Sequence, residues 1–122
     1  MDSKINLRPK ISVQSFDSTT NIEKFQNDIL RPILKLQNEI YLSLFENYAM
    51  KQISDYSNLT AERKSIFLEQ SIQKDVALKN IFIGVTIGML TAEELEKYLI
   101  ESKTYNKRIH TMLIERLKSQ IK

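Results

Sequence analysis

The 122-residue chain contains no cysteine, one histidine, two glycines and two prolines. Without cysteine it forms no disulfide, no thiolate metal site and no cysteine nucleophile. An all-β protein of this size uses many more glycines and prolines in its turns, so their scarcity favours long helices with few connections. These absences predict an all-α fold.

Motifs that would indicate catalysis are also missing. His110 is the only imidazole and stands between Ile109 and Thr111 without a recognisable motif; we interpret it as a partly exposed surface histidine, with a general base as the alternative. There is no HExxH, no carboxylate–histidine pair at helical spacing and no Gly-rich phosphate loop. We therefore assign no catalytic, cofactor-binding or metal-ligating residue, and we expect neither a cofactor nor enzymatic activity.

The most apolar run, residues 76–90 (VALKNIFIGVTIGML), contains both glycines. It is shorter than the roughly 20 residues that span a bilayer. Because it is apolar on all sides, it predicts a buried central helix. The start of the chain mixes charged and polar residues and has no secretory apolar segment, so we expect a cytoplasmic protein that does not enter the membrane.

Two parts of the chain differ in pattern. Residues 1–19 are polar, and Pro9 with the Ser/Asp/Thr cluster at 15–20 argues against a stable helix. We predict a partly flexible arm there, with an edge strand as an alternative, and a single helical domain over residues 20–122.

The first helical signal begins at Thr20, which forms a capping-box pattern with Glu23. Apolar residues then recur at spacings of three and four: Ile22, Phe25, Ile29, Ile33, Leu36, Ile40, Leu44 and Tyr48. Pro32 interrupts the backbone hydrogen bonds but not this register, which predicts one long kinked helix over roughly 21–54. The alternative is two helices, the second capped by Asp28.

Later boundaries have clear local signals. Thr60 and Asp75 are each suited to cap a helix, and Thr91 with Glu94 forms a capping box. Gly88 is placed to end the central helix in a left-handed conformation. A last helix follows from about Ser102. The sequence thus predicts a bundle of four to five helices.

A strip of small residues, Ala77, Gly84 and Gly88, lies near one side of the central helix. Such a strip allows close approach by another backbone, either a helix of the same chain or that of a second copy. The apolar stripe at 40–50, with Tyr41 and Phe45, is wider than one partner helix requires. The sequence therefore predicts a non-catalytic interaction or structural domain that forms a homodimer or binds another helical protein.

Residues 102–122 carry six basic residues against Glu115 alone, a local charge of +5. Residues 91–113 resemble a helix-turn-helix pattern at Thr91, Leu99 and Ser102, and depart from it at Glu96 and Ile100, where that family has a small residue and a glycine. The alternative function is nucleic-acid binding through 91–122. Its expected contacts are Lys103, Lys107, Arg108 and Lys118.

The segments FQNDILRPILKLQNEI (25–40) and KNIFIGVTIGMLTAEELEKYL (79–99) resemble a family of short helical bacterial proteins, some labelled "glyoxalase". This resemblance covers roughly residues 20–120 and implies an all-helical protein without a known function. Glyoxalase-type metal enzymes have βαβββ modules with His and Glu ligands, which this sequence does not match. No functional residue is carried over from the resemblance.

Overall fold

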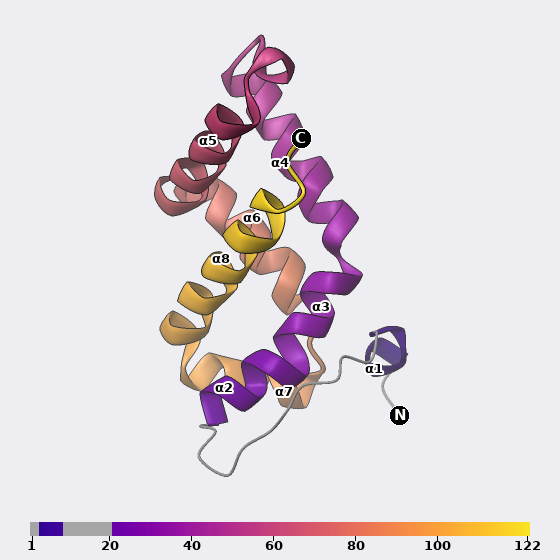
Figure 1. Cartoon of the computed structure of the whole chain (residues 1–122). Coiled ribbons are helices and arrows are strands. Elements are labelled where there is room, and N and C mark those ends of the chain that lie inside the picture. The colour runs from indigo at the N-terminus through magenta and orange to yellow at the C-terminus, as the bar shows by residue number, and fades with distance from the viewer. Residues whose placement is uncertain (1–2, 9–20) are drawn as a thin grey trace.

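The computed structural model describes residues 3–8 and 21–122, and every regular element within them is a helix (Figure 1). The predicted all-α class is confirmed. The elements in chain order are α1 (Ser3–Leu7), α2 (Asn21–Phe25), the π-helical segment η1 (Gln26–Leu30), α3 (Arg31–Leu36), α4 (Asn38–Gln52), the 3-10 turn η2 (Tyr56–Asn58), α5 (Ala61–Lys74), α6 (Val76–Ile87), α7 (Ala92–Ile100) and α8 (Ser102–Lys118). None of the helices in these ranges is both long and apolar enough to cross a bilayer.

The stretch predicted as one kinked helix is divided into α2, η1, α3 and α4, so the single helix is not confirmed. Pro32 lies in the first turn of α3, directly after the π-helical segment. There the Arg31 N–H bonds to the Gln26 carbonyl, five residues back. The wider turn accommodates a proline that cannot donate the usual bond. A second break follows at Gln37, whose φ of −93° and ψ of 12° are not helical.

The predicted caps at Thr60 and Asp75 are confirmed. Thr60 Oγ1 accepts the Arg63 N–H at 3.2 Å, and Asp75 Oδ1 accepts the Leu78 N–H at 3.0 Å. Asp75 also accepts the Tyr48 hydroxyl at 2.9 Å, which links α4 to the α5–α6 corner. Hydrogen bonds from the Leu78 N–H and the Tyr48 hydroxyl lower the pKa of the Asp75 carboxyl. The proposed Thr20 cap lies outside the described residues.

The turn between α6 and α7 differs from the prediction at one residue. Gly88 has φ −61° and ψ −19°, so the left-handed conformation predicted for it is wrong. The chain instead leaves α6 through consecutive tight turns and enters α7 at Thr91. There the predicted capping box is present, since Thr91 Oγ1 accepts the Glu94 N–H and Glu94 Oε1 accepts the Thr91 N–H. The reciprocal cap at Thr91 positions α7 without a left-handed glycine.

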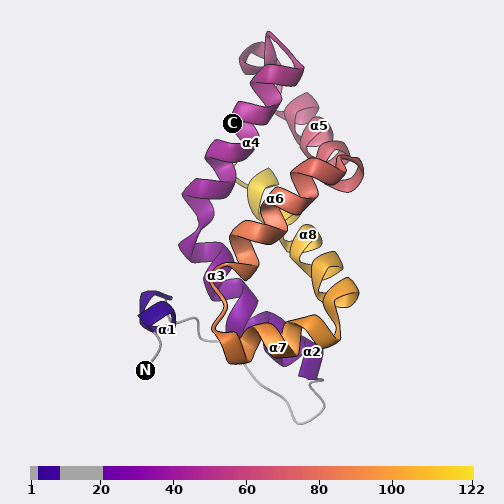
Figure 2. The same ribbon diagram turned by 180° about the vertical axis from the view of Figure 1, so that it is seen from behind.

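The core is centred on α8 and not on α6. Five residues of α8 are buried, and this helix contacts η1, α5, α6 and α7. Its buried residues are Tyr105, Ile109, Met112, Leu113 and Leu117. Helix α6 crosses one side of α8 (Figure 2). The side of α6 that faces away from α8 is exposed to solvent, as Val76 and Ile81 show. A helix does form within residues 76–90, but the prediction that it is buried at the centre of the fold is wrong, because one of its sides is exposed and α8 lies at the centre.

The N-terminal residues that the structure describes form α1, which corrects the prediction that no helix forms in this part of the chain. Arg8 makes a bidentate ion pair with Glu94, at 2.6 and 2.8 Å, and also donates to the Met89 carbonyl at 2.6 Å. Lys4 Nζ donates to the Leu90 carbonyl at 3.2 Å. Burial raises the pKa of Glu94, but hydrogen bonds from Arg8 and Thr91 outweigh it and hold that pKa below its usual value. These contacts attach α1 to the corner between α6 and α7.

Candidate functional site

The outer side of α6 is an uncharged and largely apolar surface, which we call the α6 surface. Only Leu78, Phe82 and Thr86 of this helix are buried. Val76 is 66% exposed and Ile81 is 49% exposed. The exposed residues that form the α6 surface are Val76, Ala77, Asn80, Ile81, Gly84 and Gly88. At 100° per residue they cover one continuous side of the helix, with Gly84 near its centre.

The space above Gly84 is open. A Cβ atom built at this position meets no atom within 4 Å, apart from the backbone of its own helix and its chain neighbours. Of the two predicted alternatives, close packing of Gly84 against another helix of the same chain is therefore wrong as far as the described residues are concerned. Ala77 and Gly88 are exposed as well. The strip of small residues exists as predicted, but it faces outward.

No other helix of comparable length has such a surface. Among the described helices of at least nine residues, α4, α5, α7 and α8 all expose charged side chains, for example Glu46, Arg63, Glu96 and Lys107. The exposed residues of α6 include no charged side chain, and its one charged residue, Lys79, is half-buried beside α8. A solvent-facing helix normally has charged or polar residues on that side, so the α6 surface is the unusual feature of this fold.

Tyr41 and Phe45 were assigned to helix packing or to an interface, and the structure places both inside the chain. Tyr41 is fully buried against Phe82, with ring centroids 5.8 Å apart. Phe45 is 2% exposed and lies 6.0 Å from the Phe67 ring. Neither side chain can contact a second copy without unfolding. The stripe at 40–50 is largely covered by α5, α6 and η2. Within it, only Ile40 and Met50 remain exposed as large apolar residues.

Two of the four basic residues assigned to nucleic acid are engaged in contacts within the chain. Lys103 and Lys107 are exposed, whereas Arg108 is half-buried and donates to Gln26 Oε1 of η1 at 2.7 Å. Lys118 pairs with Glu69 of α5 at 3.3 Å. Helices α7 and α8 are separated by Glu101 alone, whereas a helix-turn-helix has a turn of about three to four residues. The geometry gives no specific support to a recognition helix here.

His110 of α8 is half-buried and faces α6, which agrees with its interpretation as a partly exposed histidine. Its Nε2 atom is buried and has no hydrogen-bond partner among the described residues. Burial lowers the pKa of the imidazole; a hydrogen bond to the Lys79 backbone opposes this effect, and the Lys79 charge adds to it. Among the described residues no carboxylate is found to act on the ring, so their geometry offers no general-base arrangement.

Replacing His110 with glutamine is expected to reduce the acid sensitivity of folding. The unfolded chain binds a proton near the ordinary pKa of 6.5, whereas the folded chain binds it only at lower pH. The wild type therefore loses stability as the pH falls through 6.5 towards the folded pKa, and this contribution is absent well above 6.5. Urea unfolding of both proteins at about pH 7.5 and about pH 5 measures the effect. An equal loss of stability in both proteins would contradict it.

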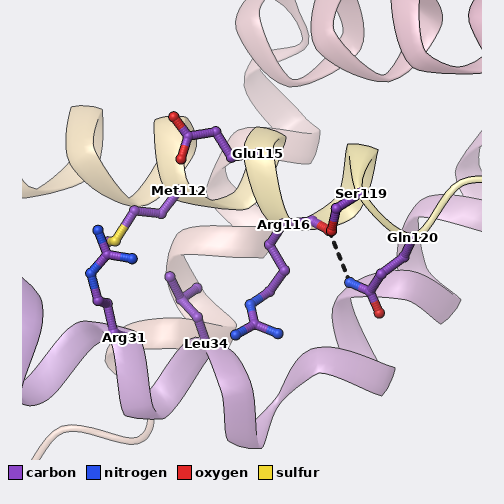
Figure 3. A pocket seen from close by; sticks show the side chains of 7 residues that line it. All are labelled: Arg31, Leu34, Met112, Glu115, Arg116, Ser119 and Gln120. Atoms are coloured by element: carbon purple, nitrogen blue, oxygen red, sulfur yellow. Dashed lines mark hydrogen bonds between the residues drawn. The ribbon is translucent and has the colours of Figure 1, made fainter. Parts of the chain in front are cut away.

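A second feature is a cavity of about 460 Å³ between α3 and α8, shown in Figure 3. Arg31 and Arg116 both extend into the space between these helices, and neither was singled out from the sequence. The two arginines are 85 positions apart, and each stands within an ordinary helical pattern. The sequence therefore gives no sign that they share a cavity. The described residues contain no group of three His, Asp or Glu side chains that could hold a metal ion.

Comparisons with known proteins do not place this fold or this surface in a family. No family model matches the chain, and neither a curated protein nor a solved structure is detectably similar to it.

Proposed function

We propose that this protein is a non-catalytic helical interaction domain that self-associates through the α6 surface. The observation that carries the proposal is that the surface centred on Gly84 is uncharged and exposed, and that no other part of the described chain covers Gly84. Exposed apolar surface without charge is typical of contact sites. The absence of any charged group on it favours an equally uncharged partner, and a second copy of the chain has one.

The spacing of large and small residues makes the α6 surface complementary to itself. In a two-fold dimer each residue i faces residue j while j faces i. If the axis passes midway between Ile81 and Gly84, the Ile81 side chain of one copy lies over Gly84 of the other. Ala77 then lies over Gly88. Ile81, the large residue nearest the axis, thus meets a position without a side chain, which is the condition for close packing of two helices.

The expected association is weak. Complete burial of an aliphatic side chain contributes about 1.5–3 kcal/mol. Ile81 is 49% exposed and Val76 is 66% exposed, so each is already partly buried in the monomer. Burying the remainder contributes on the order of 1–2 kcal/mol for each side chain. Two copies supply four such side chains, against an entropic cost of association of about 4–15 kcal/mol. We therefore expect a reversible dimer that forms only at high protein concentration.

Replacing Gly84 with lysine is expected to abolish the dimer while leaving the fold intact. The side chain enters open space, and glycine in a helix interior costs about 1 kcal/mol relative to good helix formers, so the monomer should become slightly more stable. The charge would lie at the centre of the interface. Light scattering or sedimentation over a concentration series should show the wild type rising from 14.3 kDa towards twice that mass and the variant remaining at 14.3 kDa.

Ser43→Lys is the matched control, because it adds the same charge at an exposed position in the middle of α4. It should dimerise as the wild type does. A wild type that stays at 14.3 kDa at every concentration, or equal loss of dimer in both variants, would overturn the proposal. Nucleic-acid binding and the resemblance to "glyoxalase"-labelled proteins stay predictions of the sequence.

A further inference from the structure

The cavity between α3 and α8 is lined by two arginines, Arg31 and Arg116, that form no ion pair with any carboxylate of the described residues. Arg31 Nε donates to Asn27 Oδ1 at 2.9 Å, and Arg116 Nη1 donates to Asn38 Oδ1 at 3.3 Å. Both acceptors are neutral amides. The ion pairs found among the described residues, Arg8–Glu94 and Lys118–Glu69, involve neither arginine.

The one acidic residue at the cavity is turned away from both arginines. In Figure 3 the Glu115 carboxylate lies on the far side of α8, whereas the two guanidinium groups lie between α8 and α3. Each guanidinium uses one nitrogen in the hydrogen bond to its amide and keeps others free. Two sets of N–H donors are thus directed into one cavity.

A network of amide groups holds the Arg116 end of the cavity in place. Asn38 and Gln120 exchange hydrogen bonds in both directions, each at 2.8 Å. Gln120 Nε2 also donates to the Arg116 carbonyl at 3.0 Å, and Ser119 Oγ donates to the same oxygen at 2.7 Å. Because these bonds fix the last turn of α8 against α4, less conformational entropy is lost when a ligand binds.

The wall between the arginines is apolar. Leu34 of α3 and Met112 of α8 line the cavity, and they are 2% and 7% exposed respectively. Figure 3 shows Leu34 between the two guanidinium groups. The cavity volume of about 460 Å³ falls within the range of about 300–1,000 Å³ that is usual for small-molecule sites.

We propose that this cavity binds a small phosphate monoester with an apolar substituent. The phosphate would be held by Arg31 and Arg116, and the substituent would lie on Leu34 and Met112. Two guanidinium groups carry a charge of +2, which a phosphate dianion matches and a single carboxylate does not. Arginine forks also suit the several oxygens of a phosphate.

The first experiment is a titration with phenyl phosphate, followed by amide NMR at low ionic strength. Saturable shifts should appear along 31–38 and 112–120. Inorganic phosphate should bind at the same place more weakly, because it lacks the apolar part, and benzoate should bind more weakly than phenyl phosphate, because it carries one charge. Shifts that never saturate, that lie elsewhere, or that are as strong with benzoate would overturn the proposal.

Charge variants test the assignment of the two arginines. Arg31→Gln and Arg116→Gln should each weaken phenyl phosphate binding by about tenfold or more, as expected for a lost charge-assisted hydrogen bond. Arg116→Lys keeps the charge but lacks the paired N–H donors of the guanidinium group, and it should weaken phenyl phosphate binding by a similar amount. Glu115→Gln should strengthen binding, because it removes the one negative charge at the cavity.

Lys35→Gln is the matched control, since Lys35 is exposed on the same helix and does not line the cavity. It should change the affinity by less than about twofold, as expected for a screened surface charge. An equal loss in Lys35→Gln and Arg116→Gln would show non-specific attraction and overturn the site. Gly84→Lys should bind phenyl phosphate as the wild type does, so this test is independent of the proposed dimer.

Discussion

Replacing Phe82 with alanine is expected to lower the free energy of unfolding by about 3–5 kcal/mol, the range for a fully buried aromatic side chain. Phe82 has no exposed surface and contacts the Tyr41 ring edge-on, with an interplanar angle of 78°. It is the largest side chain that α6 places in the core. Its removal leaves a cavity between α6 and α4. Urea unfolding monitored by circular dichroism, at a concentration where the chain is monomeric, measures the loss.

Ile81→Ala provides the comparison within the same turn of the helix. Ile81 is 49% exposed on the α6 surface, so its truncation should cost no more than about 1 kcal/mol in the monomer. Similar losses for the two variants would contradict the orientation of α6. A small loss for Ile81→Ala together with a weaker dimer would support both the orientation and the proposed interface.

The second large effect is expected at Thr86, where replacement by valine should cost about 1–3 kcal/mol. The Thr86 hydroxyl donates to the Phe82 carbonyl at 2.8 Å, so at the 2.7 Å contact with Tyr41 it is the tyrosine that donates. Burial raises the pKa of the Tyr41 phenol to about 12, although Thr86 and the Arg116 charge act in the opposite direction, so the donor is protonated at any ordinary pH. Valine preserves the shape of threonine but leaves this donor buried without an acceptor.

A double-mutant cycle separates this cost from simple packing. Tyr41→Phe removes the donor while Thr86 keeps its bond to Phe82, so it should cost only about 0.5–1.5 kcal/mol. The double variant should be more stable than the sum of the two single losses implies, because it contains no unpaired hydroxyl. Additive losses within about 0.5 kcal/mol would contradict this account of the hydrogen bonds.

The helix starts could be predicted because their causes are local. Thr60, Asp75 and Thr91 each accept an N–H three residues ahead, and no distant residue is needed for that bond. Gly88 was predicted wrongly by the same local reasoning. A glycine permits a left-handed turn without requiring it, and the turn into the Thr91 capping box is made with φ at −61°.

The division of the first helix and the position of α1 could not be predicted in the same way. The apolar register continues across Gln26–Leu30 whether the turn is α- or π-helical, so periodicity does not distinguish them. α1 is held through Arg8 by Glu94, which is 86 residues away. A five-residue helix has little stability of its own, and its contacts with the α6–α7 corner are not visible in the local sequence.

By itself, the sequence determined that this protein is built of helices and where most of them begin, because side-chain periodicity and capping act over a few residues. The tertiary structure alone decided which side of α6 is covered. Valine, isoleucine and glycine fit a buried or an open side equally well, and the outcome depends on where α4 and α8 lie. It also decided that Arg31 and Arg116 share a cavity in which neither is ion-paired among the described residues, since the fold brings together residues that are 85 positions apart.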